Sequence, residues 1–119
     1  MSEQTNNPVH DAIATAIAEN DVILFMKGTP QAPACGFSAR SVGALQALGT
    51  SFAGVDVLPD PRIRQELSAI SNWPTIPQLF FDGELVGGAD IVAEMYESGE
   101  LAQVLGVEQP APIQIENRL

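Results

Sequence analysis

Val22-Ile23-Leu24-Phe25-Met26 runs directly into Lys27-Gly28-Thr29-Pro30-Gln31-Ala32-Pro33-Ala34-Cys35-Gly36-Phe37-Ser38, and this stretch decides the fold. The first five residues form a continuous apolar run, which is typical of a strand buried on both faces of a sheet. A Gly/Pro-rich loop over residues 28–34 follows, and the pattern then predicts a helix from about Cys35 to Leu48. Its expected inward positions are Phe37, Val42, Leu45 and Leu48. Cys35 therefore opens a helix, where free N–H groups and the helix dipole favour a thiolate.

Cys35 is the only cysteine in the chain, and Ser38 stands where a Cys-x-x-Cys redox pair has its second sulfur. No intramolecular disulfide can form, so Cys35 needs a thiol or a metal supplied from outside. A single cysteine fits a reducing compartment. Residues 1–11 contain neither a basic region nor an apolar segment of the kind found in targeting peptides. We therefore expect a cytoplasmic protein.

Composition and charge limit the possible partners. The chain has 119 residues, of which 45% are hydrophobic and 17% charged, so one soluble domain is expected. The formal net charge of −10 argues against binding to nucleic acid or to anionic membranes, which attract basic surfaces. No apolar run approaches the ~20 residues of a membrane span. We expect a flexible N-terminus over 1–7, a domain over 8–106 and a tail over 107–119.

The rest of the chain alternates helical and extended patterns, which indicates an α/β protein with a mixed sheet. Helices are predicted over 9–19, from Asp60-Pro61 to about residue 70, over 90–97 and over 99–105. Strands are predicted over 52–57, 78–81 and 84–86. Asp82-Gly83 between the last two strands is a strong hairpin signal, and Gly49 is a candidate helix C-cap.

This order of elements resembles the thioredoxin fold, a four-stranded mixed sheet flanked by helices on both faces. Five motifs narrow the resemblance to monothiol glutaredoxins of the Cys-Gly-Phe-Ser class, and they occur at compatible spacing between Val9 and Gly106. They are Lys27-Gly28-Thr29-Pro30, Cys35-Gly36-Phe37-Ser38, Ser71-Asn72-Trp73-Pro74-Thr75-Ile76-Pro77-Gln78-Leu79, Gly83-Glu84-Leu85-Val86-Gly87-Gly88 and Asp90-Ile91-Val92.

Several of these residues also have a chemical interpretation of their own. Lys27 could aim its ammonium at the sulfur or at a carboxylate, or it could simply be solvated. Arg64 lies in the first turn of a helix, which is unfavourable for a cation unless it meets an anion. Ile76-Pro77 matches the family's cis-proline turn, which would leave the Ile76 backbone free to pair with a peptide; an ordinary turn is the alternative. Asp90 could cap its helix, neutralise an ammonium group, or do both.

The resemblance implies a glutathione site and an iron–sulfur ligand. The implied glutathione-binding residues are Lys27, Cys35, Phe37, Arg64, Ile76, Pro77, Gly88, Ala89 and Asp90. Cys35 is the implied ligand of a [2Fe–2S] cluster, which ordinarily takes four thiolates. Two chains and two glutathione molecules supply four, so a cluster-bridged homodimer is the minimal assembly. A BolA-type protein is a possible hetero-partner, and apo iron–sulfur proteins are the expected recipients. Ala89 departs from the cysteine that many relatives have there.

Three functions remain open from the sequence. The favoured one is an iron–sulfur cluster carrier, which would not be an enzyme. The second is a glutathione-dependent thiol–disulfide oxidoreductase in which Cys35 is the catalytic nucleophile. The third is an interaction module on a thioredoxin fold that uses neither chemistry. The long loop before Cys35 favours the carrier, because in the family it accompanies weak oxidoreductase activity.

Overall fold

The structure is a computed structural model that describes residues 7–108. Its helices are α1 (Pro8–Glu19), α2 (Gly36–Ala47), α3 (Pro61–Ser71), α4 (Ala89–Ser98) and α5 (Glu100–Leu105). Its strands are β1 (Val22–Met26), β2 (Gly28–Thr29), β3 (Ala32–Pro33), β4 (Ala53–Asp56), β5 (Gln78–Phe81) and β6 (Glu84–Gly87). Most of the expected terminal segments 1–7 and 107–119 lies outside the described residues, so those boundaries stay a prediction.

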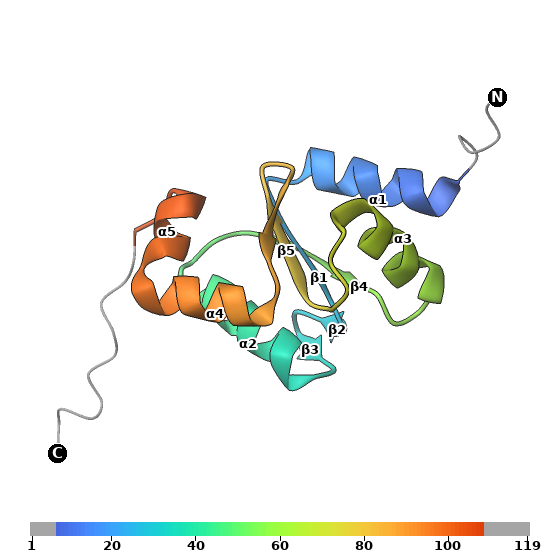
Figure 1. The fold of residues 1–119 in the computed structure, drawn as a ribbon. Coiled ribbons are helices and arrows are strands. Elements are labelled where there is room, and N and C mark those ends of the chain that lie inside the picture. The colour runs from blue at the N-terminus through green and yellow to red at the C-terminus, as the bar shows by residue number, and fades with distance from the viewer. Residues whose placement is uncertain (1–6, 109–119) are drawn as a thin grey trace, which may run out of the picture.

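The central sheet has the strand order β4-β1-β5-β6 (Figure 1). Strand β4 is parallel to β1, whereas β5 is antiparallel to both β1 and β6. The carboxyl ends of β1, β4 and β6 therefore lie at the same end of the sheet as the amino end of β5. The expected mixed sheet of four strands is confirmed.

Helices cover both faces of this sheet, as expected (Figure 1). Val22, Leu24 and Met26 of β1 pack into a core with residues of α2, α4 and α5. Ile23 and Phe25, which point to the opposite face, pack into a second core with residues of α1 and α3. All five residues of β1 are buried, because each face of the strand has its own hydrophobic core.

Local turn chemistry explains where several elements begin and end. Asp60 is the N-cap of α3, and its carboxylate accepts a hydrogen bond from the Arg62 N–H at 3.0 Å. Asp82 and Gly83 have φ values of 52° and 85°, the left-handed pair that a two-residue hairpin turn requires. Gly49, with φ of 70°, directly follows Leu48, the C-cap of α2. These expected turns and caps are confirmed to within one residue.

Two expectations about the segment around Cys35 are wrong. The region predicted as a loop over 28–34 contains the small hairpin β2–β3, in which the Thr29 hydroxyl accepts a hydrogen bond from the Ala32 N–H at 3.1 Å. Phe37 does not point inward, because it is 54% exposed. It lies in the first turn of α2 and lines a pocket instead of the core.

Among residues 7–108, no helix combines the length and the apolar character needed to cross a bilayer.

Candidate functional site

Cys35 is the N-cap of α2, which places its sulfur at the amino end of the helix. The sulfur accepts a hydrogen bond from the Ser38 N–H at 3.4 Å. This is the geometry of a capping side chain, in which a negative group meets the free N–H groups of the first turn. The sequence-based placement of the sulfur at a helix start is confirmed.

The Ser38 side chain connects this sulfur to the end of β1. Ser38 is completely buried, and its Oγ lies 3.4 Å from the Cys35 Sγ. The same oxygen accepts a hydrogen bond from the backbone N–H of Lys27 at 3.0 Å. A hydroxyl that already accepts from Lys27 still has its hydrogen free to donate to a Cys35 thiolate. In the sequence, Ser38 marks only the place of a missing second cysteine, and no local pattern indicates this role.

The surroundings of Cys35 lower the pKa of its thiol. Partial burial of the sulfur acts in the opposite direction and raises the pKa. The Ser38 hydroxyl, the N–H groups of Ser38 and Phe37, and the charge of Lys27 together outweigh it. The thiolate is therefore more populated near neutral pH than in a free cysteine, whose pKa is about 8.5.

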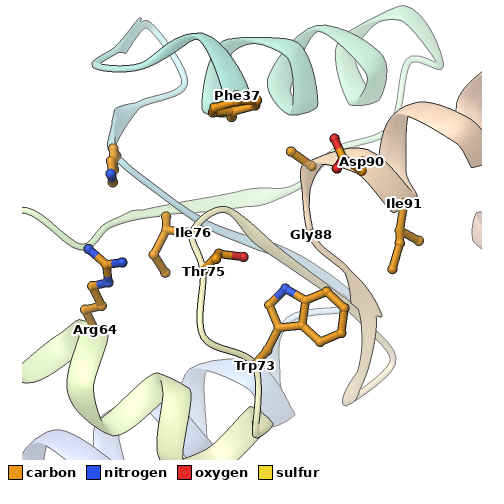
Figure 2. Close-up of a pocket in the computed structure, with 10 residues that line it drawn as sticks. Phe37, Arg64, Trp73, Thr75, Ile76, Gly88, Asp90 and Ile91 are labelled. Carbon is orange, nitrogen blue, oxygen red and sulfur yellow. The ribbon is translucent and has the colours of Figure 1, made fainter.

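A pocket of about 360 Å³ is lined by Phe37, in the first turn of the helix that Cys35 caps (Figure 2). That volume suits a small organic or peptide ligand. The pocket is lined by Lys27, Phe37, Arg64, Trp73, Thr75, Ile76, Gly88, Ala89, Asp90 and Ile91. Seven of the nine residues expected to bind glutathione are among them. Cys35 and Pro77 are not; Pro77 is fully buried, and Cys35 adjoins the pocket through its contacts with the first turn of α2.

Charges of opposite sign stand on opposite sides of the pocket. Figure 2 shows Arg64 on one side and Asp90 on the other, with Thr75 and Ile76 between them. Asp90 lies in the first turn of α4, whose N-cap is Gly88 and makes no side-chain capping bond. The expectation that Asp90 caps this helix is wrong, since the residue lies inside the helix, past the cap position. Its carboxylate is exposed at the pocket.

The backbone between Trp73 and Pro77 forms the floor of the pocket. The Ile76–Pro77 peptide bond is cis, as the resemblance implied. Within residues 7–108 the Ile76 backbone N–H and C=O have no hydrogen-bond partner. The buried Gln78 amide holds this segment, because its Nε2 donates to the carbonyls of Trp73 and Thr75, both at 3.0 Å.

Two glycines let the start of α4 approach this floor closely. A Cβ on Gly88 would lie 2.9 Å from the Trp73 Nε1. Gly87 has φ of 153°, and a Cβ there would lie 2.8 Å from the Ile91 side chain. Trp73, Thr75 and Ile91 were not predicted as site residues. The available signal was that Trp73 and Thr75 directly precede Ile76-Pro77 in a recognised motif.

The fold and the site define a thioredoxin-fold protein with one reactive sulfur beside a pocket of peptide size. The glutaredoxin family model matches residues 22–86. The chain is 58% identical over 95 residues to Glutaredoxin 4 of Escherichia coli (strain K12), which covers 80% of this chain and 83% of the relative. It is 53% identical over 93 residues to a probable monothiol glutaredoxin 2 of Rickettsia typhi, covering 78% and 84%.

Solved structures agree with these matches. A monomeric truncated mutant of Trypanosoma brucei 1-C-Grx1 has a TM-score of 0.76 at 42% identity, covering 87% of this chain and 96% of that one. A buckwheat glutaredoxin–glutathione complex has a TM-score of 0.75 at 21% identity, covering 89% and 94%, and shows the shared fold. The chain belongs to the glutaredoxin family, and within it to the monothiol glutaredoxins.

Proposed function

We propose that this monothiol glutaredoxin binds glutathione beside Cys35 and carries a [2Fe–2S] cluster between two protomers, for assembly and transfer of iron–sulfur clusters. The observation that carries the proposal is a single sulfur of lowered pKa next to a pocket with opposite charges on its two sides. The single cysteine also supports a reducing, cytoplasmic setting.

The pocket chemistry supports glutathione as the ligand. Glutathione is a tripeptide with a carboxylate at each end and one ammonium group. Lys27 and Arg64 can meet the glycine carboxylate, and Asp90 can neutralise the ammonium. The free N–H groups at the start of α4 suit the second carboxylate. The free backbone of Ile76 can pair with the extended peptide. The buckwheat glutaredoxin, which shares this fold, forms a complex with glutathione.

The donor count supports a cluster shared between two chains. A [2Fe–2S] cluster ordinarily takes four thiolates, and this chain offers one. Among the described residues, no group of three or more His, Cys, Asp or Glu side chains could hold a metal by itself. Two chains and two glutathione thiols make four donors, with Cys35 near the two-fold axis. A BolA-type partner could replace one protomer, and apo iron–sulfur proteins would receive the cluster.

The lowered pKa of Cys35 serves a second function equally well. In a glutathione-dependent oxidoreductase, the Cys35 thiolate attacks the glutathionyl sulfur of a mixed disulfide. The target protein leaves as its thiolate, and Cys35 becomes glutathionylated. A second glutathione thiolate then attacks that disulfide, which releases oxidised glutathione and restores Cys35. Ser38 cannot act as a resolving thiol, so the external glutathione is obligatory.

Anaerobic reconstitution with ferrous iron, sulfide and glutathione separates the two functions. We expect a coloured dimer, detected by absorption spectroscopy and native mass spectrometry, that does not form when glutathione is omitted. Cys35→Ser retains a good helix N-cap and removes the sulfur, so we expect a folded, colourless monomer. Glutathione binding to the cluster-free protein is measured separately by calorimetry.

A colourless monomer with rapid turnover of a glutathionylated substrate would replace the carrier function by the oxidoreductase function. A protein that binds glutathione but gives neither a cluster nor turnover would contradict both. Failure to bind glutathione at all would remove the pocket assignment on which both depend.

A further inference from the structure

Asp56 lies outside the pocket, at the carboxyl end of the edge strand β4, and its carboxylate is engaged by two backbone groups. Its Oδ1 accepts hydrogen bonds from the N–H of Gly28 and from the N–H of Leu58, both at 2.9 Å. Gly28 begins the hairpin β2–β3, so this carboxylate joins the hairpin to the sheet. The hairpin makes a second contact with β4, because the ring of Pro30 in its turn packs directly over Gly54.

The hairpin anchored by Asp56 is continuous with the segment that holds the sulfur. Lys27, the neighbour of Gly28, donates its N–H to the Ser38 Oγ at 3.0 Å. The Lys27 carbonyl accepts from the Ala34 N–H at 2.8 Å, directly before Cys35. Figure 1 shows the hairpin beside the end of β4 and next to the start of α2. Gly28 thus lies at the junction between Lys27 and the hairpin that leads to Cys35, and the Asp56 carboxylate holds this junction.

Gly28 itself cannot be replaced by a bulkier anchor. Its φ is 87°, and a Cβ there would lie 2.5 Å from the Ala32 carbonyl oxygen. The tight turn leaves the Gly28 N–H facing away from the hairpin, toward β4. A buried backbone N–H needs an acceptor, and the Asp56 side chain supplies it across a sequence separation of 28 residues.

We propose that Asp56 is a positioning residue for the thiol site: by holding the Gly28 N–H against β4, it sets where the Lys27 ammonium and the Cys35 sulfur stand relative to the pocket. This inference deepens the proposed function and rests on it for the identity of the ligand. Asp56 does not line the pocket itself, whereas Lys27 does. Asp56 therefore acts on the pocket through Gly28 and its neighbour Lys27.

The geometry specifies which property of Asp56 matters. Within residues 7–108 the carboxylate has no ion pair, and both of its hydrogen bonds are accepted by Oδ1. An asparagine has an oxygen in the same place and accepts the same two bonds. The proposal therefore requires that Asp56→Asn keeps the site and that Asp56→Ala damages it.

The test compares Asp56→Ala, Asp56→Asn and Asp56→Glu with the wild-type protein, all cluster-free. Glutathione affinity is measured by calorimetry, and the accessibility of Cys35 by its alkylation rate at one fixed pH. We expect Asp56→Ala to weaken glutathione binding about tenfold, the size of one lost hydrogen bond between the Lys27 ammonium and the ligand carboxylate, and to slow alkylation. Asp56→Glu, with its carboxylate displaced by a methylene, should do the same, and it decides the question if Asp56→Ala does not fold.

Asp21→Ala is the matched control. Asp21 is exposed next to the opposite end of β1, so its removal changes the net charge equally and leaves the hairpin untouched. Near-wild-type values for Asp56→Asn and Asp21→Ala support the proposal. Wild-type affinity and alkylation in Asp56→Glu, or an Asp56→Asn protein as impaired as Asp56→Glu, would overturn it. If the wild type itself does not bind glutathione, the proposed function fails, and the alkylation rates alone decide the role of Asp56.

Discussion

The two ends of the central sheet are built in different ways. At the end that holds the Asp82-Gly83 turn, β5 and β6 are joined by two residues, and the Asp82 N–H donates to the Asp21 carbonyl at 2.8 Å. At the opposite end, six parts of the chain converge: the residues after β1, the start of α2, the end of β4, the start of α3, the segment before β5 and the start of α4. Every pocket residue lies at this second end.

The difference between the ends lies in how their polar groups are satisfied. At the Asp82-Gly83 end, the turn is held by the hydrogen bond from the Asp82 N–H to the Asp21 carbonyl. At the pocket end, the Ile76 backbone and the buried Trp73 indole N–H have no partner among residues 7–108, and the start of α4 has no side-chain cap. Buried polar groups without partners are costly in a folded protein. At the pocket, the Ile76 backbone groups are available to pair with a polar ligand.

The largest expected effect comes from Gly87, the last residue of β6, compared with Gly83, which directly precedes β6. Gly87→Ala adds a Cβ 2.8 Å from Ile91 and strains a backbone with φ of 153°. We expect a loss of about 2–4 kcal/mol in the free energy of unfolding, together with loss of glutathione binding, because the start of α4 must move. Gly83→Ala, where the added Cβ meets open space but φ is 85°, should cost about 1–2 kcal/mol and leave glutathione binding unchanged.

Urea denaturation and calorimetry with glutathione measure the two quantities separately. If Gly83→Ala weakens glutathione binding as strongly as Gly87→Ala does, the two ends of the sheet do not differ in their effect on the pocket. A change of affinity in Gly87→Ala alone would show that only the start of α4 controls binding.

The next largest expected effect is a difference in stability between alanine variants of two buried serines of α2. Ser38 accepts a hydrogen bond from Lys27 and contacts the Cys35 sulfur, whereas the Ser41 hydroxyl is buried without a partner in the described part of the chain. We expect Ser38→Ala to cost about 2 kcal/mol of unfolding free energy, because it leaves the Lys27 N–H unpaired. It should also raise the pKa of Cys35, since the Ser38 hydroxyl helps to lower it. Ser41→Ala should be neutral or slightly stabilising.

The pH dependence of the Cys35 alkylation rate gives the pKa in each variant, and denaturation gives the stability. An unchanged alkylation profile in Ser38→Ala would show that the hydroxyl does not act on the sulfur. A stability loss in Ser41→Ala equal to that of Ser38→Ala would show that the Lys27 hydrogen bond carries no particular weight.

The structural features that are predicted best from the sequence are those determined by residues close together in the chain. The apolar run Val22–Met26, the Asp60-Pro61 helix start and the Asp82-Gly83 hairpin all appear where expected. Each depends on hydrophobic periodicity, helix-capping residues or turn residues within a few positions of one another. The placement of Cys35 at a helix start belongs to the same class, since a Pro-rich loop before a helical pattern is visible locally.

What could not be predicted depends on contacts between distant parts of the chain. The apolar side chain of Phe37 predicts an inward position, but Phe37 lies on the side of α2 that lines the pocket, whereas its neighbour Ser38 is buried. Trp73 joins the pocket only because Gly88 lets α4 approach it. The anchor from Asp56 to Gly28 spans 28 positions, and no local pattern marks it. The pocket residues Lys27, Arg64 and Asp90 were identified through the family resemblance, and the tertiary structure brings them together.

The smallest expected effect is a pH dependence of stability that originates at the pocket end alone. The pKa of Cys35 is lowered in the folded protein, whereas an unfolded cysteine titrates near about 8.5. Folding therefore favours the thiolate, so the unfolding free energy of the wild type should rise between the folded-state pKa and about 8.5 and then level off. This contribution is lost as the pH falls through the folded-state pKa. Cys35→Ser keeps the helix cap but has no thiol, so the difference between wild type and Cys35→Ser should show this rise in urea denaturation at a series of pH values. A difference that decreases with pH would mean that the folded protein favours the neutral thiol, and the electrostatic distinction between the two ends of the sheet would not hold.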